Sequence, residues 1–130
     1  MLTKVILPNF EKRNGLVTVV TQDVDSEKIL MVAYTDKTGY LETLSTGNAV
    51  YFSTSRNERW MKGEKSGNVQ KVVTILIDCD GDAIIYKVKQ KGFACHTGKI
   101  SCFFRNVLEV EEKENLLAVS TDVYDDFSHP

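Results

Sequence analysis

The chain has 130 residues, which suits one domain over residues 1–130, able to bury about two thirds of the surface that its unfolded form exposes. Its 16 Lys and Arg residues nearly balance its 18 Asp and Glu residues, and the net charge of −2 excludes an overall basic field for nucleic acid or an anionic membrane. The sequence has no signal peptide and no apolar run near the ~20 residues of a membrane helix, so we expect a cytoplasmic protein.

The N-terminal part of the chain predicts a β-hairpin. Residues 16–21 (LVTVVT) and 29–34 (ILMVAY) are apolar and rich in β-branched side chains, which is typical of strands. The segment between them, DVDSE at residues 23–27, has the composition of a turn. We therefore expect two antiparallel strands here.

A helix is expected next, over residues 37–46. Asp36 is a suitable N-cap, and Gly47 is suited to end the helix in a left-handed conformation. Helical spacing then predicts one apolar face, made of Tyr40, Leu41 and Leu44.

Residues 49–53 (AVYFS) predict a third strand, and a polar segment over residues 55–68 follows it. Composition alone favours a solvated surface loop with a half-buried Trp. The alternative is a binding loop for a phosphate-bearing ligand, because arginine binds phosphate through two parallel hydrogen bonds. The side chains that would serve such a ligand are Arg56, Arg59, Trp60, Lys62 and Ser66.

The second half of the chain predicts a long hairpin from residues 69–77 and 83–90, with Gly81 in its tight turn. A loop over residues 91–99 and another strand from residue 101 would follow. Together the elements predict an α+β fold, a mostly antiparallel twisted β-sheet with one or two helices.

Three aspartates alternate in the predicted turn, at Asp78, Asp80 and Asp82. On an extended chain they would project to one side, where they would repel one another without a cation. Oxygen ligands of this kind suit Mg²⁺, especially beside a phosphorylated substrate. The alternative is an acidic turn in water, where screening makes the repulsion small.

The chain has three cysteines, Cys79, Cys95 and Cys102, and this odd number argues against a disulfide framework. Their position beside the aspartates and His96 favours metal binding or catalysis over three inert thiols. A Cys₃ zinc site would leave the fourth tetrahedral position for water, whose pKa zinc lowers to about 7. His96 could then move protons, or could itself be a fourth ligand that closes the site. Arg105 could bind phosphate or pair with a surface acid.

Two segments of the chain resemble the signatures of the phosphoribosyl-AMP cyclohydrolase family of histidine biosynthesis. The first is DCDGD, followed after twelve residues by CHTGKISCFFR, and the second is RWMKGEKSGN, which is similar to the pattern Trp-x-Lys-Gly-Glu-x-Ser-Gly. The likeness extends over residues 14–110. Two multi-residue signatures in the same order make it highly specific.

The resemblance implies a hydrolase that adds water at C6 of the adenine ring of 1-(5-phosphoribosyl)-AMP and breaks the N1–C6 bond, the third step of histidine biosynthesis. It implies a homodimer whose zinc ligands come from both subunits, with His96 as the catalytic proton carrier. The implied cofactors are Mg²⁺ on Asp78, Asp80 and Asp82, and Zn²⁺ on Cys79, Cys95 and Cys102. The implied substrate-binding residues are Arg56, Arg59, Trp60, Lys62, Ser66 and Arg105.

The sequence also bears on two other functions. A zinc deaminase is disfavoured because its H-x-E and P-C-x-x-C motifs do not occur here. A non-catalytic, zinc-stabilised module that binds a nucleotide or RNA through the basic segment stays open as the alternative.

Overall fold

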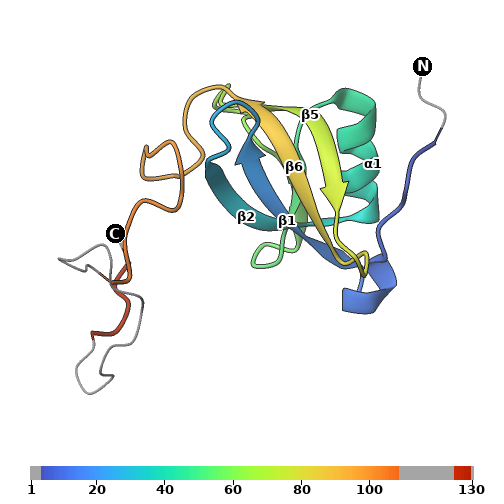
Figure 1. Cartoon of the computed structure of the whole chain (residues 1–130), viewed down its shortest axis with the longest axis horizontal. Coiled ribbons are helices and arrows are strands. Elements are labelled where there is room, and N and C mark those ends of the chain that lie inside the picture. The colour runs from blue at the N-terminus through green and yellow to red at the C-terminus, as the bar shows by residue number, and fades with distance from the viewer. Residues whose placement is uncertain (1–3, 109–124, 130) are drawn as a thin grey trace.

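The structure is a computed structural model that describes residues 4–108 and 125–129. A single curled sheet of six strands has the order β4-β3-β2-β1-β6-β5, and one α-helix packs against it (Figure 1). The strands are β1 (Leu16–Asp23), β2 (Ile29–Asp36), β3 (Val50–Ser53), β4 (Glu58–Met61), β5 (Gln70–Ile77) and β6 (Ala83–Gln90). The helices are the 3₁₀ helix η1 (Phe10–Arg13) and α1 (Lys37–Thr46).

The α+β class is confirmed, but the sheet is mixed. All neighbouring strands pair antiparallel except β1 and β6, which run parallel in the register Val19↔Ile84 and Tyr86↔Thr21. This pairing joins two hairpins that are far apart in the sequence. It also sets the start of β6 beside η1 and the end of β6 beside the β1–β2 turn (Figure 1).

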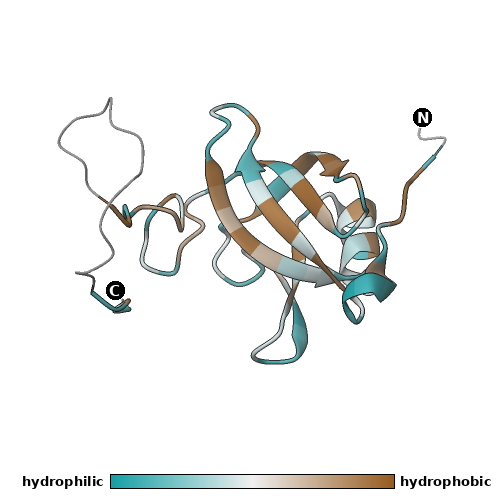
Figure 2. Ribbon diagram, turned by 60° about the horizontal axis from the view of Figure 1, so that its bottom comes forward, coloured by the Kyte–Doolittle hydropathy of each residue, from teal (hydrophilic) through white to brown (hydrophobic). Residues whose placement is uncertain are grey.

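The core lies between the sheet and α1. Alternate side chains of β1 and β6 face it, among them Val17, Val19, Ile84 and Tyr86, each at most 1 % exposed. Apolar bands therefore cross neighbouring strands of the sheet (Figure 2). The strands predicted over residues 16–21 and 83–90 are confirmed as β1 and β6.

Helix α1 begins and ends where the sequence predicts. The Asp36 carboxylate accepts a hydrogen bond of 2.8 Å from Gly39 N–H, and Gly47 ends the helix at φ 76°. The predicted apolar face is wrong for two of its residues, since Leu41 and Leu44 are exposed while Tyr40 is buried. Gly39 lies in the contact between α1 and the sheet instead of these leucines. A Cβ at this position would lie 2.5 Å from the Thr35 hydroxyl, so glycine lets the helix approach the sheet closely.

Two other expectations are corrected. The polar segment over residues 55–68 is not all loop, because Glu58–Met61 forms the edge strand β4 against β3. No strand forms over residues 101–108, and the rest of the strand expected from residue 101 lies outside the described residues. Within the described part of the chain, no helix is long and apolar enough to cross a membrane.

Candidate functional site

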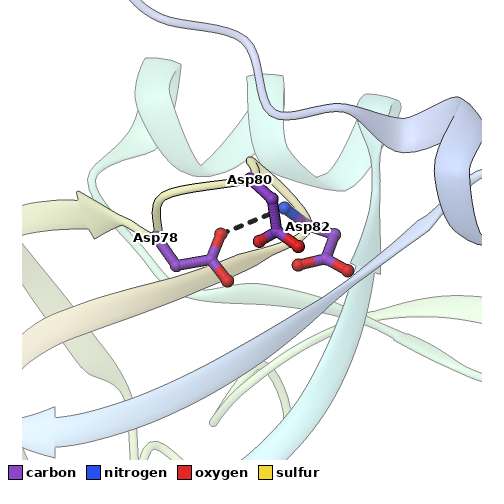
Figure 3. Close-up of side chains that lie close together, drawn as sticks. All are labelled: Asp78, Asp80 and Asp82. Atoms are coloured by element: carbon purple, nitrogen blue, oxygen red, sulfur yellow. Dashed lines mark hydrogen bonds between the residues drawn. The ribbon is translucent and has the colours of Figure 1, made fainter.

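Three aspartates in the turn between β5 and β6 converge on one point (Figure 3). One carboxylate oxygen each of Asp78, Asp80 and Asp82 lies within 4.8 Å of the other two. The Asp78 carboxylate closes the turn by accepting hydrogen bonds of 3.1 Å and 3.2 Å from the N–H groups of Asp82 and Ala83. The convergence predicted from the sequence is thus present, but a turn with Gly81 at φ 78° produces it, and not an extended strand.

Two cations of η1 lie against these carboxylates. Lys12 Nζ is 2.5 Å from Asp80 Oδ2 and 3.4 Å from Asp82 Oδ2, and Arg13 Nε donates to Asp82 Oδ2 at 3.0 Å. The hydrogen bond from Lys12 lowers the pKa of Asp80 to about 2 and raises the pKa of Lys12. Neither residue is predicted from the sequence, where two adjacent cations in a turn-prone segment are the signal available.

The aspartate donor set fits a hard divalent cation. It offers several carboxylate oxygens around one point, and Lys12 already places a positive charge there. Asp82 is buried, whereas Asp78 and Asp80 are exposed, so additional ligands such as water or a phosphate have access. The three aspartates can therefore hold Mg²⁺.

A second cluster, the cysteine loop, spans residues 94–102 beyond the far end of β6. Its backbone closes on itself through hydrogen bonds from Ala94 N–H to Ile100 O at 3.0 Å and from Cys95 N–H to Lys99 O at 3.1 Å. Cys102 N–H donates to a carbonyl of β2 at 2.8 Å, which joins the loop to the sheet. The loop predicted over residues 91–99 is confirmed.

The thiols of Cys95 and Cys102 lie close enough to interact. Desolvation raises the pKa of Cys102, and the neighbouring Cys95 thiol adds to this. The Thr97 hydroxyl, 3.0 Å from Cys95 Sγ, lowers the pKa of Cys95 and favours its thiolate. Lys62 belongs to the same cluster: partial burial lowers the pKa of its ammonium, and the two thiols oppose that shift.

Cys79 does not join the other two cysteines within one chain. It is exposed in the aspartate turn, before β6, whereas Cys95 follows the other end of that strand. The eight residues of β6 span roughly 26 Å at about 3.3 Å per residue. Figure 1 shows the turn and the cysteine loop at opposite ends of β6. One chain therefore assembles two of the three sulfurs expected to bind zinc.

His96 and Arg105 both lie near the C-terminal segment. The exposed His96 ring is 5.9 Å, centroid to centroid, from the ring of His129. Arg105 stacks 4.8 Å over the Phe127 ring and donates to Ser128 O at 3.2 Å. His96 is thus beside the cysteines, while the Arg105 guanidinium contacts the C-terminal segment.

The residues expected to bind substrate in the 55–68 segment divide into two groups. A surface hollow is lined by four of them, Arg56, Arg59, Trp60 and Ser66. Arg59 is already paired with Glu42 and Glu64, and Trp60 packs on Tyr51 with a ring distance of 4.8 Å. Lys62 contacts the cysteine cluster instead, so the segment reaches both the hollow and the thiols.

Comparison with known proteins identifies a family for this chain. The model of the family described as phosphoribosyl-AMP cyclohydrolase matches residues 31–104. The chain belongs to this family. The match contains the aspartate turn, the cysteine loop and the 55–68 segment, and thus both signature segments except Arg105.

Relatives support the assignment over most of the chain. A phosphoribosyl-AMP cyclohydrolase of Methanothermobacter thermautotrophicus is 46% identical over 128 residues, 93% of each chain. One of Archaeoglobus fulgidus is 55% identical over 93 residues, 72% of this chain and 86% of that protein. The histidine biosynthesis bifunctional protein HisIE of Deinococcus radiodurans is 52% identical over 101 residues, 78% of this chain but only 46% of that protein.

Proposed function

We propose that this chain is a phosphoribosyl-AMP cyclohydrolase, a single-domain hydrolase of histidine biosynthesis. It would add water to C6 of the adenine ring of 1-(5-phosphoribosyl)-AMP and break the N1–C6 bond. Membership of the family carries this proposal, because the family model bears that name and so does a relative aligned over 93% of this chain. The geometry supports it by providing an oxygen-lined cluster and a sulfur-lined cluster in one chain.

The two clusters suit different metals. Asp78, Asp80 and Asp82 would hold Mg²⁺, a hard cation that prefers oxygen. Cys79, Cys95 and Cys102 would hold Zn²⁺, which prefers thiolates and keeps one open position with three protein ligands. When bound, zinc would supply a water whose pKa is lowered to about 7.

His96 would carry protons in the reaction. The second ribosyl group makes the purine cationic, so C6 is an electrophile for water and N1 can leave from the tetrahedral adduct. His96 is exposed beside Cys95, where its ring can take a proton from the attacking water and return one to the leaving N1. Its pairing with the His129 ring would give way when substrate enters.

The basic side chains would bind the two phosphates of the substrate. Arg56 and Ser66 line the hollow beside Arg59, and Lys62 lies close to the thiols, so the ligand would extend from the hollow toward the zinc site. Trp60 has one face on Tyr51, which supports a packing role at the base of the hollow. Arg105 would reach substrate only after leaving Phe127.

The active form would be a homodimer with zinc ligands from both subunits. The distance between Cys79 and the cysteine loop supports this, since a second chain can bring its Cys79 to the loop. The outer face of the sheet supports it as well. Val32, Val20, Ile85 and Leu76 form a row across four adjacent strands, and both ends of the row are nearly half exposed.

The activity is tested by incubating the purified protein with phosphoribosyl-AMP and following the ultraviolet absorbance of the ring-opened product, with Zn²⁺ and Mg²⁺ supplied. A sample stripped of metal by a chelator is the control and should regain activity when the metals return. Absence of product at every metal supplement would refute the proposed function.

A further inference from the structure

A chain of hydrogen bonds crosses the core and ends at the cysteine loop. The hydroxyls of Thr21 and Tyr51 are 2.7 Å apart, and Tyr51 donates to Gln70 Oε1 at 2.6 Å. Gln70 Nε2 donates to Gln90 Oε1 at 2.9 Å. Gln90 Nε2 then donates to Ile100 O at 3.1 Å, in the cysteine loop. The chain thus joins β1, β3, β5 and β6 to the segment that carries Cys95 and Cys102.

The direction of these hydrogen bonds is fixed by the donors and acceptors available. Because Tyr51 donates to Gln70 Oε1, the Gln70 amide nitrogen points toward Gln90 Oε1. The Gln90 amide nitrogen is consequently left to donate to the loop, where it also lies 3.4 Å from Gly92 O. Each amide has one orientation that satisfies the whole chain.

Three of the four residues in this hydrogen-bonded series are buried, whereas Gln90 at the loop end is partly exposed. Thr21, Tyr51 and Gln70 are all 0% exposed. A buried amide costs free energy unless its hydrogen bonds are made, so a purely packing role would be served better by apolar residues. The buried amide of Gln70 therefore favours a positioning role, exerted through Gln90 on the cysteine loop.

The hydrogen bonds reach the cysteine loop at its neck, where Ala94 and Ile100 are joined by a backbone hydrogen bond. Ile100 O accepts from both Gln90 Nε2 and Ala94 N–H, so Gln90 holds the two sides of the loop together. At the same neck, a Cβ on Gly92 would lie 2.2 Å from Asn68 Oδ1, and only glycine allows this close contact with the 55–68 segment. The neck thus fixes the loop against the sheet and against the second signature segment.

We propose that Gln70 and Gln90 are positioning residues that hold the cysteine loop in the geometry in which Cys95 and Cys102 bind metal. The inference rests on the proposed function for the role of the loop. The hydrogen bonds of Gln70 and Gln90 are present in metal-free protein, so their effect on the loop can be tested without measuring catalysis.

The test uses Gln90→Met, which keeps the length of the side chain and removes its amide hydrogen bonds to Gln70, Gly92 and Ile100. Alkylation of each cysteine in metal-free protein is followed over time by mass spectrometry. Cys95, which is buried, should be alkylated about tenfold faster because the loop loses the hydrogen bonds that keep it closed. Exposed Cys79 should react at an unchanged rate, and zinc affinity, measured against a competing chelator, should fall by about the same factor.

Two further variants keep the test decisive. Gln22→Met removes another glutamine hydrogen bond to a loop carbonyl, at 2.9 Å from Glu27 O, away from the cysteine loop, and should leave Cys95 unchanged. Tyr51→Phe removes only the hydroxyl that orients Gln70. The rate of alkylation of Cys95 should then rise by less than in Gln90→Met. If Gln90→Met does not fold, this second variant tests the proposal.

Equal acceleration of Cys79 and Cys95 would indicate general loosening and overturn the proposal, as would an unchanged Cys95 rate in the folded variants. An unchanged Cys95 rate in an active enzyme refutes only the positioning role. Absence of ring opening by the unaltered protein refutes only the proposed function.

Discussion

The Lys12 ammonium lies 2.5 Å from Asp80 Oδ2, inside the cluster of carboxylates that would bind a divalent cation. It is itself half-exposed and belongs to η1, far from the aspartates in sequence. The lysine and the metal would therefore compete for the same oxygens.

Lys12→Met should tighten binding of Mn²⁺, used as a probe for Mg²⁺, by about two- to fivefold, because an exposed ion pair is worth little and a competing charge is removed. Electron paramagnetic resonance of free Mn²⁺ measures the affinity. Lys28→Met, in the turn at the other end of β1, is the matched control and should have no effect. Unchanged or weaker binding in Lys12→Met would contradict the competition.

Cys79→Ala and Cys95→Ala should each be inactive alone and should complement each other when mixed. If the zinc site takes Cys79 from one subunit and Cys95 from the other, a random mixture forms hybrid dimers with one intact site, and activity recovers to about a quarter of the unaltered value. The mixed sample should also bind zinc in proportion. No recovery after subunit exchange would exclude a shared site.

His96→Ala should keep zinc and lose turnover by a factor of about 10² to 10⁴, the range for loss of a general acid or base. Elemental analysis and the substrate assay measure the two properties separately. His129→Ala is the control, since its ring lies beside His96 but is not among the proposed metal ligands or catalytic residues, and it should keep most activity. Loss of zinc in His96→Ala would instead make His96 a ligand.

Arg56→Ala and Arg59→Ala should differ. Arg56 Nε makes two long, exposed contacts, at 3.4 Å to Ser53 Oγ and at 3.6 Å to Glu58, so its removal should raise KM by about tenfold without changing the melting temperature. Arg59 ties β4 to Glu42 of α1, and its removal should also lower the melting temperature by a few degrees. Glu42→Ala should reproduce the loss of stability without the full effect on KM; identical behaviour of all three variants would refute this division.

The fold should lose stability between pH 10 and 12. Burial raises the pKa of Tyr86 from 10.0 to about 12, and burial raises the pKa of Tyr51 further still. A raised pKa means that the folded state favours the neutral phenol. The resulting stability is present below the unfolded value of about 10 and is lost as the pH rises toward the folded value.

Tyrosine absorbance at alkaline pH, recorded together with circular dichroism, tests this expectation. Ionisation of the buried tyrosines should coincide with unfolding, and Tyr86→Phe should move the unfolding to higher pH. Complete ionisation of the tyrosines in a protein whose circular dichroism is unchanged would contradict the assigned burial.

Much of the local structure follows from the sequence because its causes are local. Asp36 and Gly47 bound α1 through a side-chain cap and a left-handed residue within one turn of each end. Gly81 reverses the chain in the aspartate turn for a similar reason. The strands β1, β2, β5 and β6 follow from runs of β-branched residues with turn residues between them.

The errors arise where distant segments decide the outcome. Strand β4 forms in a polar segment because β3 offers it a free edge, not because Glu58 and Arg59 favour strands. Leu41 and Leu44 have helical spacing suited to burial, but close contact at Gly39 turns Tyr40 and Thr43 toward the sheet. Gln70 and Gln90 carried no signal in the sequence, since a buried amide chain exists only once the strands are paired.

The sequence by itself determined the family, the α+β class and the types of side chain available for chemistry. These follow from short segments of the sequence, in which the signature residues and the strand-forming residues are close neighbours. Only the tertiary structure decided which of these side chains meet. The parallel pairing of β1 with β6 puts the aspartate turn beside Lys12 and leaves Cys79 a strand length from Cys95. Such pairings depend on packing between segments dozens of residues apart, which local preferences do not encode.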